Sequence, residues 1–321
     1  MNIWTQNTIS ANERRGSMMS DSIRRNGQNI KRAHGRVQKN MGKIAKIIED
    51  GLAHIMQEEM IEVGRDVTSL DDNDKVFVAY FNTCLLFPIP QAYQVHVHRD
   101  FICPPECKEG YELLLHKIQS GEKFGAHLSK TTKATENHDL MLYDWGIYHF
   151  HLGTEVEDDG YMQRTSKLLY AYIDNQDIYF IGIFDHGKWN DQDLIEIIHK
   201  YYPESIKGWL IEGTPEKVFS EDDRKILRKA HVNTFITVSD GTSYMGPGWG
   251  ITAAGTSAKV RMRANDKHHE AIDLEKRIIL ELPNAENYSW YMEREGENIN
   301  LFNDKGEGCT LYRWIPLKNR L

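Results

Sequence analysis

The sequence predicts an α+β fold with a central antiparallel sheet, flanking helices and a smaller C-terminal α+β domain. Three short apolar runs at 147–152, 168–173 and 178–184 are rich in Ile, Leu, Tyr and Phe, and polar segments of loop length separate them. Runs of this length and composition are typical of consecutive antiparallel strands. A long stretch with helical spacing precedes them at 37–63, and short strand-like runs return after residue 230.

Length and composition limit the class of protein. The 321 residues suffice for two domains that each bury a core, and 40% hydrophobic and 27% charged residues are ordinary for a globular chain. No run approaches the ~18 apolar residues of a membrane span, and the polar, basic N-terminus lacks the apolar core of a signal peptide. The cysteines, Cys84, Cys103, Cys107 and Cys309, are too few and irregular for a disulfide framework. We expect a cytoplasmic protein with reduced thiols and no membrane partner.

Basic side chains are concentrated at the N-terminus. Residues 1–48 hold ten Lys and Arg against Glu13 and Asp21, about +8 (ten minus two), whereas the whole chain carries −8. We expect residues 1–36 to form a basic arm that contacts nucleic-acid phosphates, or alternatively packs against the acidic remainder. The candidate substrate-binding residues in the arm are Arg24, Arg25, Lys31, Arg32 and Arg36.

A main domain is expected at 37–230. Its first element is the amphipathic helix at 37–63, where Ile, Leu and Met recur at helical spacing. The apolar run at 75–87 predicts a strand that Pro88 and Pro90 end. A helix is expected at 106–119, with Leu and Ile facing inward.

Two histidines and two cysteines lie close together after this strand, in QVHVHRDFICPPEC. His96 and His98 share a strand face, and Cys103 and Cys107 follow. A structural zinc site is one interpretation, but two prolines interrupt a spacing that no standard zinc knuckle has. Strand histidines beside ordinary buried cysteines are the favoured interpretation.

The second half of the main domain continues with a short helical segment at 136–143 and the three predicted strands. Asp174-Asn175-Gln176-Asp177 has the chemistry of a hairpin turn between the last two strands. A helix follows to about Tyr201, stopped by Pro203. The sequence Ser220-Glu221-Asp222-Asp223 is a capping box that starts another helix.

A small C-terminal α+β domain is expected at 231–321. The expected strands are 233–239, 259–263, 289–293, 299–302 and 310–314, and the expected helix is 267–282. The segment GPGWGITAAGTS lacks the Lys-Ser/Thr pair of a phosphate loop. A strand rather than a helix is expected after it, so its glycines are interpreted as turn residues.

The candidate site lies on the three-stranded meander. His149 and His151 are two apart on one strand, so their side chains leave the same face. Arg164 precedes the second strand and His186 follows the third. A tight sheet brings the four towards one surface. Each also has a structural explanation: packing for the strand histidines, a loop ion pair for Arg164 and a turn for His186.

The order of these residues resembles the sheet of the RelE/ParE toxin superfamily, which is grouped with barnase-like nucleases. In that family a strand with basic residues ends in Gly, an Arg-bearing turn starts the next strand, and the third strand ends in Gly-His-Arg or similar. Here HFHLG stands at the first position, Tyr161-Met162-Gln163-Arg164 at the second and Phe184-Asp185-His186-Gly187-Lys188 at the third. The resemblance covers residues 145–189, with histidines where arginines are usual and a longer loop before Arg164.

The resemblance implies a metal-independent endoribonuclease, toxin-like or a phage-defence effector. RNA or the ribosome would be its substrate, an antitoxin-like protein a partner, and no cofactor would be needed. Histidine can act as base or acid near neutral pH, and arginine presents a fork of donors to phosphate oxygens. The candidate catalytic residues are His149, His151, Arg164, His186 and Lys188, and Trp189 joins the substrate-binding set.

Two alternatives use the same meander. His149 and His151 with Asp185 or His186 can hold Zn²⁺ or Mn²⁺ in a metal-dependent hydrolase. A non-catalytic protein- or nucleic-acid-binding regulator would instead use aromatic anchors on the sheet. Those anchors are Trp145, Tyr148 and Trp189.

Overall fold

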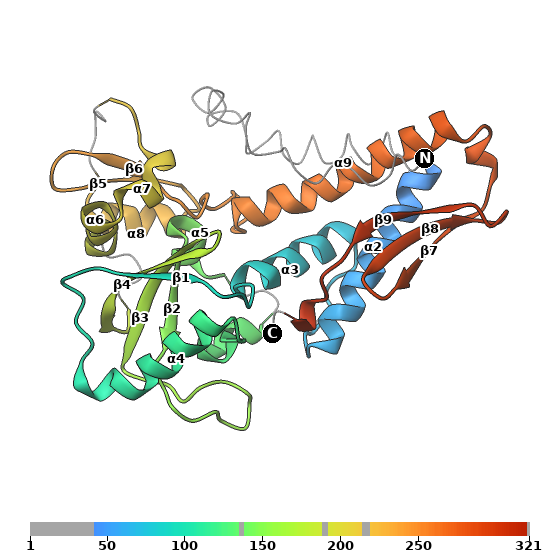
Figure 1. The fold of residues 1–321 in the computed structure, drawn as a ribbon. Helices are drawn as coiled ribbons and strands as arrows, with labels where there is room; N and C mark the ends of the chain where they lie inside the picture. The colour runs from blue at the N-terminus through green and yellow to red at the C-terminus, as the bar shows by residue number, and fades with distance from the viewer. Residues whose placement is uncertain (1–41, 135–137, 188–191, 214–218, 320–321) are drawn as a thin grey trace. The chain divides into compact units, whose positions relative to one another are not determined.

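The computed structural model describes residues 42–134, 138–187, 192–213 and 219–319 (Figure 1). The basic arm at 1–36, with Arg24, Arg25, Lys31, Arg32 and Arg36, lies outside them, as do Lys188 and Trp189. The predicted α+β class is confirmed, with helices beside a four-stranded, a two-stranded and a three-stranded sheet. In the described parts of the chain, no helix combines the length and apolar character needed to cross a membrane.

The four-stranded sheet has the order β1-β4-β3-β2. Strands β2 (Ile147–His151), β3 (Lys167–Asp174) and β4 (Asp177–Asp185) are antiparallel, as predicted. β1 (Gln94–Val97) pairs in parallel with β4, so the sheet is mixed. Asn175 and Gln176 form the predicted hairpin turn, where Asn175 has a φ of 54° that asparagine tolerates better than most residues.

Apolar side chains cover both faces of this sheet. Helix α4 (Lys108–Ser120), in the helical region expected at 106–119, packs with the end of α3 (Asn73–Leu86) against a face that includes Phe150 and Phe180. The other face, with Tyr170, packs against α5 (Leu140–Trp145), α6 (Gln192–Tyr201) and α7 (Pro203–Ile206), which Figure 1 labels. Strands β5 (Phe235–Thr237) and β6 (Ser243–Met245) pack on this second face too.

The run at 75–87 is helical, so the predicted strand is wrong. It forms most of α3, which begins where the Asp72 carboxylate accepts a hydrogen bond from the Lys75 N–H at 2.7 Å. Val76, Phe77, Tyr80 and Cys84 are all buried. A helix buried on most sides has no polar face, so its sequence reads like a buried strand.

The predicted strand at 259–263 is likewise wrong. These residues form the first turns of α9 (Ala258–Glu281), and the helix expected at 267–282 is its continuation. Val260 and Ala264 are fully buried four residues apart, which is a helical spacing that the charged residues around them obscure. A helix therefore follows the Gly-rich segment.

Residues 246–250 of the Gly-rich segment pack against the carboxyl end of α5. The N–H of Gly248 donates to the Asp144 carbonyl at 3.0 Å, and that of Gly250 donates to the Tyr143 carbonyl at 2.8 Å. A Cβ on Gly246 or Gly248 would overlap backbone oxygens of α5. The glycines thus permit close backbone approach, and these two N–H groups are already occupied rather than free to bind a phosphate.

A buried ion pair lies at the same place. Asp144, at the end of α5, accepts hydrogen bonds from Arg228 Nε at 3.0 Å and Nη2 at 2.5 Å, and both side chains are about 5% exposed. Burial raises the pKa of the Asp144 carboxyl, and the Arg228 guanidinium opposes that effect. Arg228 belongs to α8 (Glu221–Lys229), which begins with the predicted capping box at Ser220.

The chain divides into two compact units whose boundaries differ from the predicted domains. Among the described residues, one unit contains 42–59, 70–77 and 264–316, and the other contains 60–69, 78–263 and 317–319. The predicted boundary at 230/231 is crossed because β5, β6 and the Gly-rich segment pack with the four-stranded sheet.

The first unit combines α2 (Lys43–Glu62), the start of α3 and the later part of α9 with an antiparallel sheet. This sheet consists of β7 (Trp290–Glu295), β8 (Asn298–Asn303) and β9 (Gly308–Arg313), close to the three strands predicted there. Within the unit, the Glu59 carboxylate of α2 pairs with Arg294 at 2.8 Å and accepts from the Trp314 indole at 3.1 Å. The sequence predicted α2 and these three strands, but placed them in different domains.

A buried histidine in the first unit lies between two carboxylates. His268 Nδ1 is 2.5 Å from Glu49 Oε1, and its Nε2 is 3.5 Å from Asp74 Oδ1. Burial lowers the pKa of His268, but hydrogen bonds to Asp74 and Glu49 outweigh burial and raise it to about 9. The ring therefore carries a positive charge at neutral pH.

Candidate functional site

Three histidines and an arginine come together at one corner of the central sheet. The ring centroids of His151 and His186 are 6.3 Å apart, and His149 lies 6.3 Å from the Tyr170 ring on the neighbouring strand. The charge of Arg164 contributes to the pKa of both His151 and His186. The structure thus brings His149, His151, Arg164 and His186 to one place.

The strand register explains this convergence. His151 pairs with Leu168 across β2 and β3, and Leu168 pairs with Phe184 across β3 and β4. The pairing of β3 with β4 then extends past the end of β4, because the His186 N–H donates to the Ser166 carbonyl at 3.1 Å. Gly187 follows with a φ of 99°, which lets the chain turn immediately after His186.

His151 is too deeply buried to touch a substrate. It is 1% exposed, and its Nδ1 accepts a hydrogen bond from the Thr165 backbone N–H at 3.3 Å. Burial, with smaller contributions from His149, Arg164 and His186, lowers the pKa of His151 to about 4. Because Nδ1 accepts, the proton of this neutral ring is on Nε2. His151 was predicted as a catalytic group, and its burial leaves no surface through which it could contact a substrate directly.

A second buried histidine, which the sequence did not single out, supports His151. His127 Nδ1 donates to the His151 carbonyl oxygen at 2.8 Å, and burial lowers the pKa of the His127 ring. His127 lies in the short 3₁₀ turn Gly125–His127. The Ala126 carbonyl in this turn accepts a hydrogen bond from the Met162 N–H at 2.8 Å. The sequence around His127 contains no spacing that relates it to β2.

The other three residues of the cluster, His149, His186 and Arg164, are more exposed to solvent than His151. The His149 side chain is 20% exposed, and its Nδ1 is 3.7 Å from Oδ2 of Asp139. Asp139 caps α5 by accepting from the Leu142 N–H at 3.0 Å, so its carboxylate is held in place. His186 and Arg164 are exposed. Partial burial, followed by the charges of His149 and Arg164, lowers the pKa of His186 below its usual 6.5.

The metal alternatives find no support in the ligand geometry. Across the residues that the structure describes, no three His, Cys, Asp or Glu side chains are grouped to hold a metal ion. His96 Nε2 is instead 2.6 Å from Asp177 Oδ1, and His98 Nε2 is 3.0 Å from the Ile181 carbonyl oxygen. Cys103 and Cys107 are free thiols, as are Cys84 and Cys309.

The aromatic anchors of the binding alternative are largely internal. Trp145 is 3% exposed and belongs to the core beside β2. Tyr148 is partly buried, and its hydroxyl donates to the Leu85 carbonyl at 2.7 Å. Both side chains therefore stabilise the fold, and Trp189 lies outside the described residues.

Comparisons with known proteins add no family to this geometry: no protein-family model, no curated protein and no solved structure matches the chain.

Proposed function

We infer that the protein is a metal-independent ribonuclease that acts through His149, His186 and Arg164. The observation that carries this inference is the presence of an exposed imidazole (His186), a partly buried one (His149) and a guanidinium at one corner of the sheet, around the buried ring of His151. These three groups supply a base, an acid and a cation, which is the set that cleavage through the ribose 2′-hydroxyl requires.

The chemistry assigns a role to each group. His186, whose lowered pKa keeps it neutral at pH 7, takes the proton of the 2′-hydroxyl. The 2′-oxygen attacks phosphorus, the bond from phosphorus to the 5′-oxygen breaks, and His149 gives that oxygen a proton. The products are a 2′,3′-cyclic phosphate and a free 5′-hydroxyl. Arg164 donates to the equatorial phosphate oxygens, where negative charge accumulates.

The buried groups hold these reagents in position. The Thr165 N–H fixes the ring of His151, and His127 fixes the carbonyl of the same residue, so the end of β2 is held from two sides. The Asp139 carboxylate lies 3.7 Å from His149 Nδ1, which is too long for a hydrogen bond but close enough to attract a protonated ring. Preorganisation of this kind lets groups act without rearranging during the reaction.

The partner classes follow from the same proposal. The substrate is RNA, either free or on the ribosome. The four free thiols favour a cytoplasmic location for the protein. Because the order of the site residues on its strands resembles that of RelE-like toxins, the protein would also have a neutralising protein partner.

The test is cleavage of RNA by the purified chain, with and without ribosomes, in the presence of EDTA. His186→Ala and Arg164→Ala should each lower the cleavage rate by about 10²–10⁴-fold. His116→Ala and Arg99→Ala are matched controls, because both side chains are highly exposed and outside the cluster, and they should cleave like the wild type.

Three results would reject the proposal. RNA that stays intact in both conditions would exclude nuclease activity, and full activity in both cluster variants would exclude this site. Loss of wild-type activity in EDTA would favour the metal-dependent alternative.

A further inference from the structure

The outer half of β4 has an open edge. β1 pairs with β4 only from Asp177 to Phe180, whereas β4 continues to Asp185. Successive backbone N–H and C=O groups of a strand point to alternate sides, so half of those between Ile181 and Asp185 face away from β3. No other described strand pairs with this edge. The first carbonyl of this edge, that of Ile181, accepts a hydrogen bond from His98 Nε2 at 3.0 Å.

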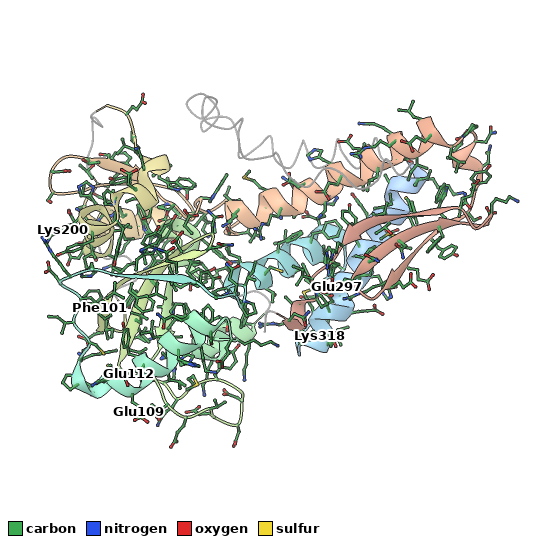
Figure 2. The ribbon with its side chains drawn as sticks, viewed as in Figure 1. Phe101, Glu109, Glu112, Lys200, Glu297 and Lys318 are labelled. Atoms are coloured by element: carbon green, nitrogen blue, oxygen red, sulfur yellow. The ribbon has the colours of Figure 1, made fainter. Side chains whose placement is uncertain are left out.

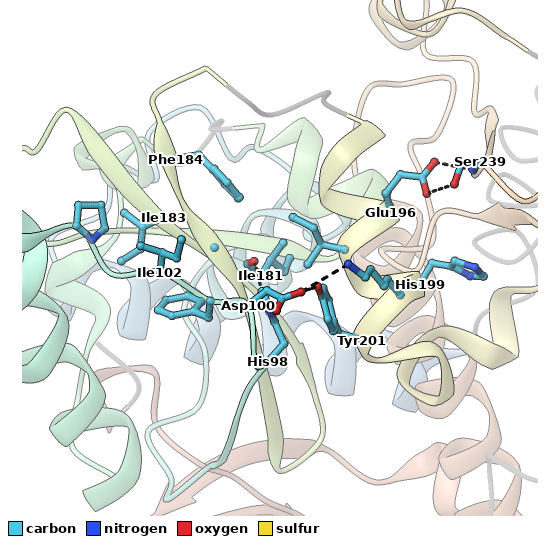
Figure 3. A pocket seen from close by; sticks show the side chains of 15 residues that line it. His98, Asp100, Ile102, Ile181, Ile183, Phe184, Glu196, His199, Tyr201 and Ser239 are labelled. Carbon is cyan, nitrogen blue, oxygen red and sulfur yellow. Dashed lines mark hydrogen bonds and ion pairs between the residues drawn. The ribbon is translucent and has the colours of Figure 1, made fainter.

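This edge opens into a groove with a volume of about 570 Å³. One wall is the loop after β1, which contains Asp100 and Pro104, and the other is α6, as the close view in Figure 3 shows. The lining is largely apolar, with side chains from the loop, from β4 and from α6. These are Phe101, Ile102, Ile181, Ile183, Phe184 and Ile197.

Polar contacts join the two walls of the groove. The Tyr201 hydroxyl donates to Asp100, and Lys200 Nζ lies 3.6 Å from the same carboxylate. The ring of His98 stacks on that of Tyr201 with centroids 4.2 Å apart. Figure 2 labels Phe101 and Lys200, which mark the loop and the helix.

The hydrogen-bonding groups and the charges indicate what the groove accepts. An extended backbone complements the open edge, and its alternate side chains would face the apolar walls. The lining has two carboxylates, Asp100 and Glu196, against one ammonium group, Lys200. Just beyond the lining, the exposed Asp185 is paired with Lys167 at 3.2 Å, so it adds no net charge. The excess of negative charge favours a segment with Lys or Arg.

We propose that the edge of β4 from Ile181 to Asp185 accepts an extended, basic peptide segment of another protein as an added strand. The proposal does not depend on nuclease activity, because the groove residues are distinct from His149, Arg164 and His186.

The first test uses acetylated hexapeptides of alternating valine and lysine, added at millimolar concentration to the isotope-labelled full chain. Binding should shift the amide signals of β4 between Ile181 and Asp185. Methylation of single peptide nitrogens should then weaken binding about tenfold at every second position and leave the intervening positions unchanged, because only alternate N–H groups face β4. The protein itself is unaltered in this comparison.

The second test changes the charge of the groove. Asp100→Lys should weaken peptide binding several-fold, whereas Glu204→Lys, an equal change at an exposed residue outside the lining, should leave it unchanged. Absence of shifts in β4 would overturn the proposal. Equal sensitivity to methylation at all positions, or equal effects of the two charge reversals, would overturn it as well.

Discussion

His151 should make the stability of the central sheet depend on pH in the mildly acidic range. Its pKa is about 4 in the folded protein against 6.5 for an unperturbed histidine. Between these values the unfolded chain binds a proton that the folded chain does not bind. The stabilisation is therefore complete above pH 6.5 and is lost as the pH falls towards 4. At 1.36 kcal/mol per pKa unit, the shift corresponds to about 3 kcal/mol, and the 1% exposure of His151 leaves little screening by water.

The assay is urea unfolding followed through the amide signals of β3 at several pH values from 7.5 to 4.5. His151→Asn is the informative variant, because asparagine keeps an acceptor near the Thr165 N–H but does not titrate. Its unfolding free energy should vary with pH by about 2–3 kcal/mol less than that of the wild type.

A direct titration decides the same question. The ring signals of His151 should not titrate between pH 5.5 and 8. A His151 titration near pH 6.5, or equal pH dependence in His151→Asn and the wild type, would refute the assignment of a buried neutral ring.

Three further predictions concern other groups. For His268 the pH dependence of stability should have the opposite sign, because its pKa is raised from 6.5 to about 9. The stabilisation of its unit is complete below pH 6.5, and about 3 kcal/mol should be lost as the pH rises through 9. Urea unfolding, followed through the amide signals of that unit, measures this loss. Arg228→Met should lower the free energy of unfolding by about 3–5 kcal/mol, because Asp144 is then buried without this cation. Adding Asp144→Asn should recover part of that stability. An equal loss in the single and double variants, measured by denaturant unfolding, would contradict this prediction. If His186 is the base, kcat/KM for RNA should fall on the acid side below pH 6.5, and the profile of His186→Ala should lack that limb.

Local patterns predicted the meander well. Strands β2, β3 and β4 are short apolar runs bounded by turn residues, and the two-residue turn at Asn175 fixes their antiparallel order. The capping box at Ser220 and the end of α6 before Pro203 were also readable, because each depends on neighbouring residues. Elements with a local signal were therefore predicted correctly.

Elements whose surroundings come from distant parts of the chain were not predictable. The run at 75–87 forms a helix buried on most sides, and the run at 259–263 begins a helix whose buried positions lie among charged residues. The units are discontinuous in sequence, so no composition shift marks their boundaries. In both cases the deciding contacts are long-range.

The candidate site shows the same division. Strand order and a period of two were enough to place His149, His151, Arg164 and His186 together. The sequence could not show that other elements cover His151, and it gave no reason to select His127 or Asp139. Proximity follows from register, whereas burial depends on which segments cover each face.

The packing of residues 246–250 against α5 has a consequence for synthesis on the ribosome. The carbonyls of Tyr143 and Asp144, just before β2, receive their partners from a segment roughly a hundred residues later. At ~5–20 residues per second, translation leaves this junction uncapped for about 5–20 s. The buried Asp144 must also wait for Arg228 during that interval. The junction before β2 can therefore be completed only late in translation, so a nascent chain released before residue 250 would carry all four site residues without the packing at the start of β2.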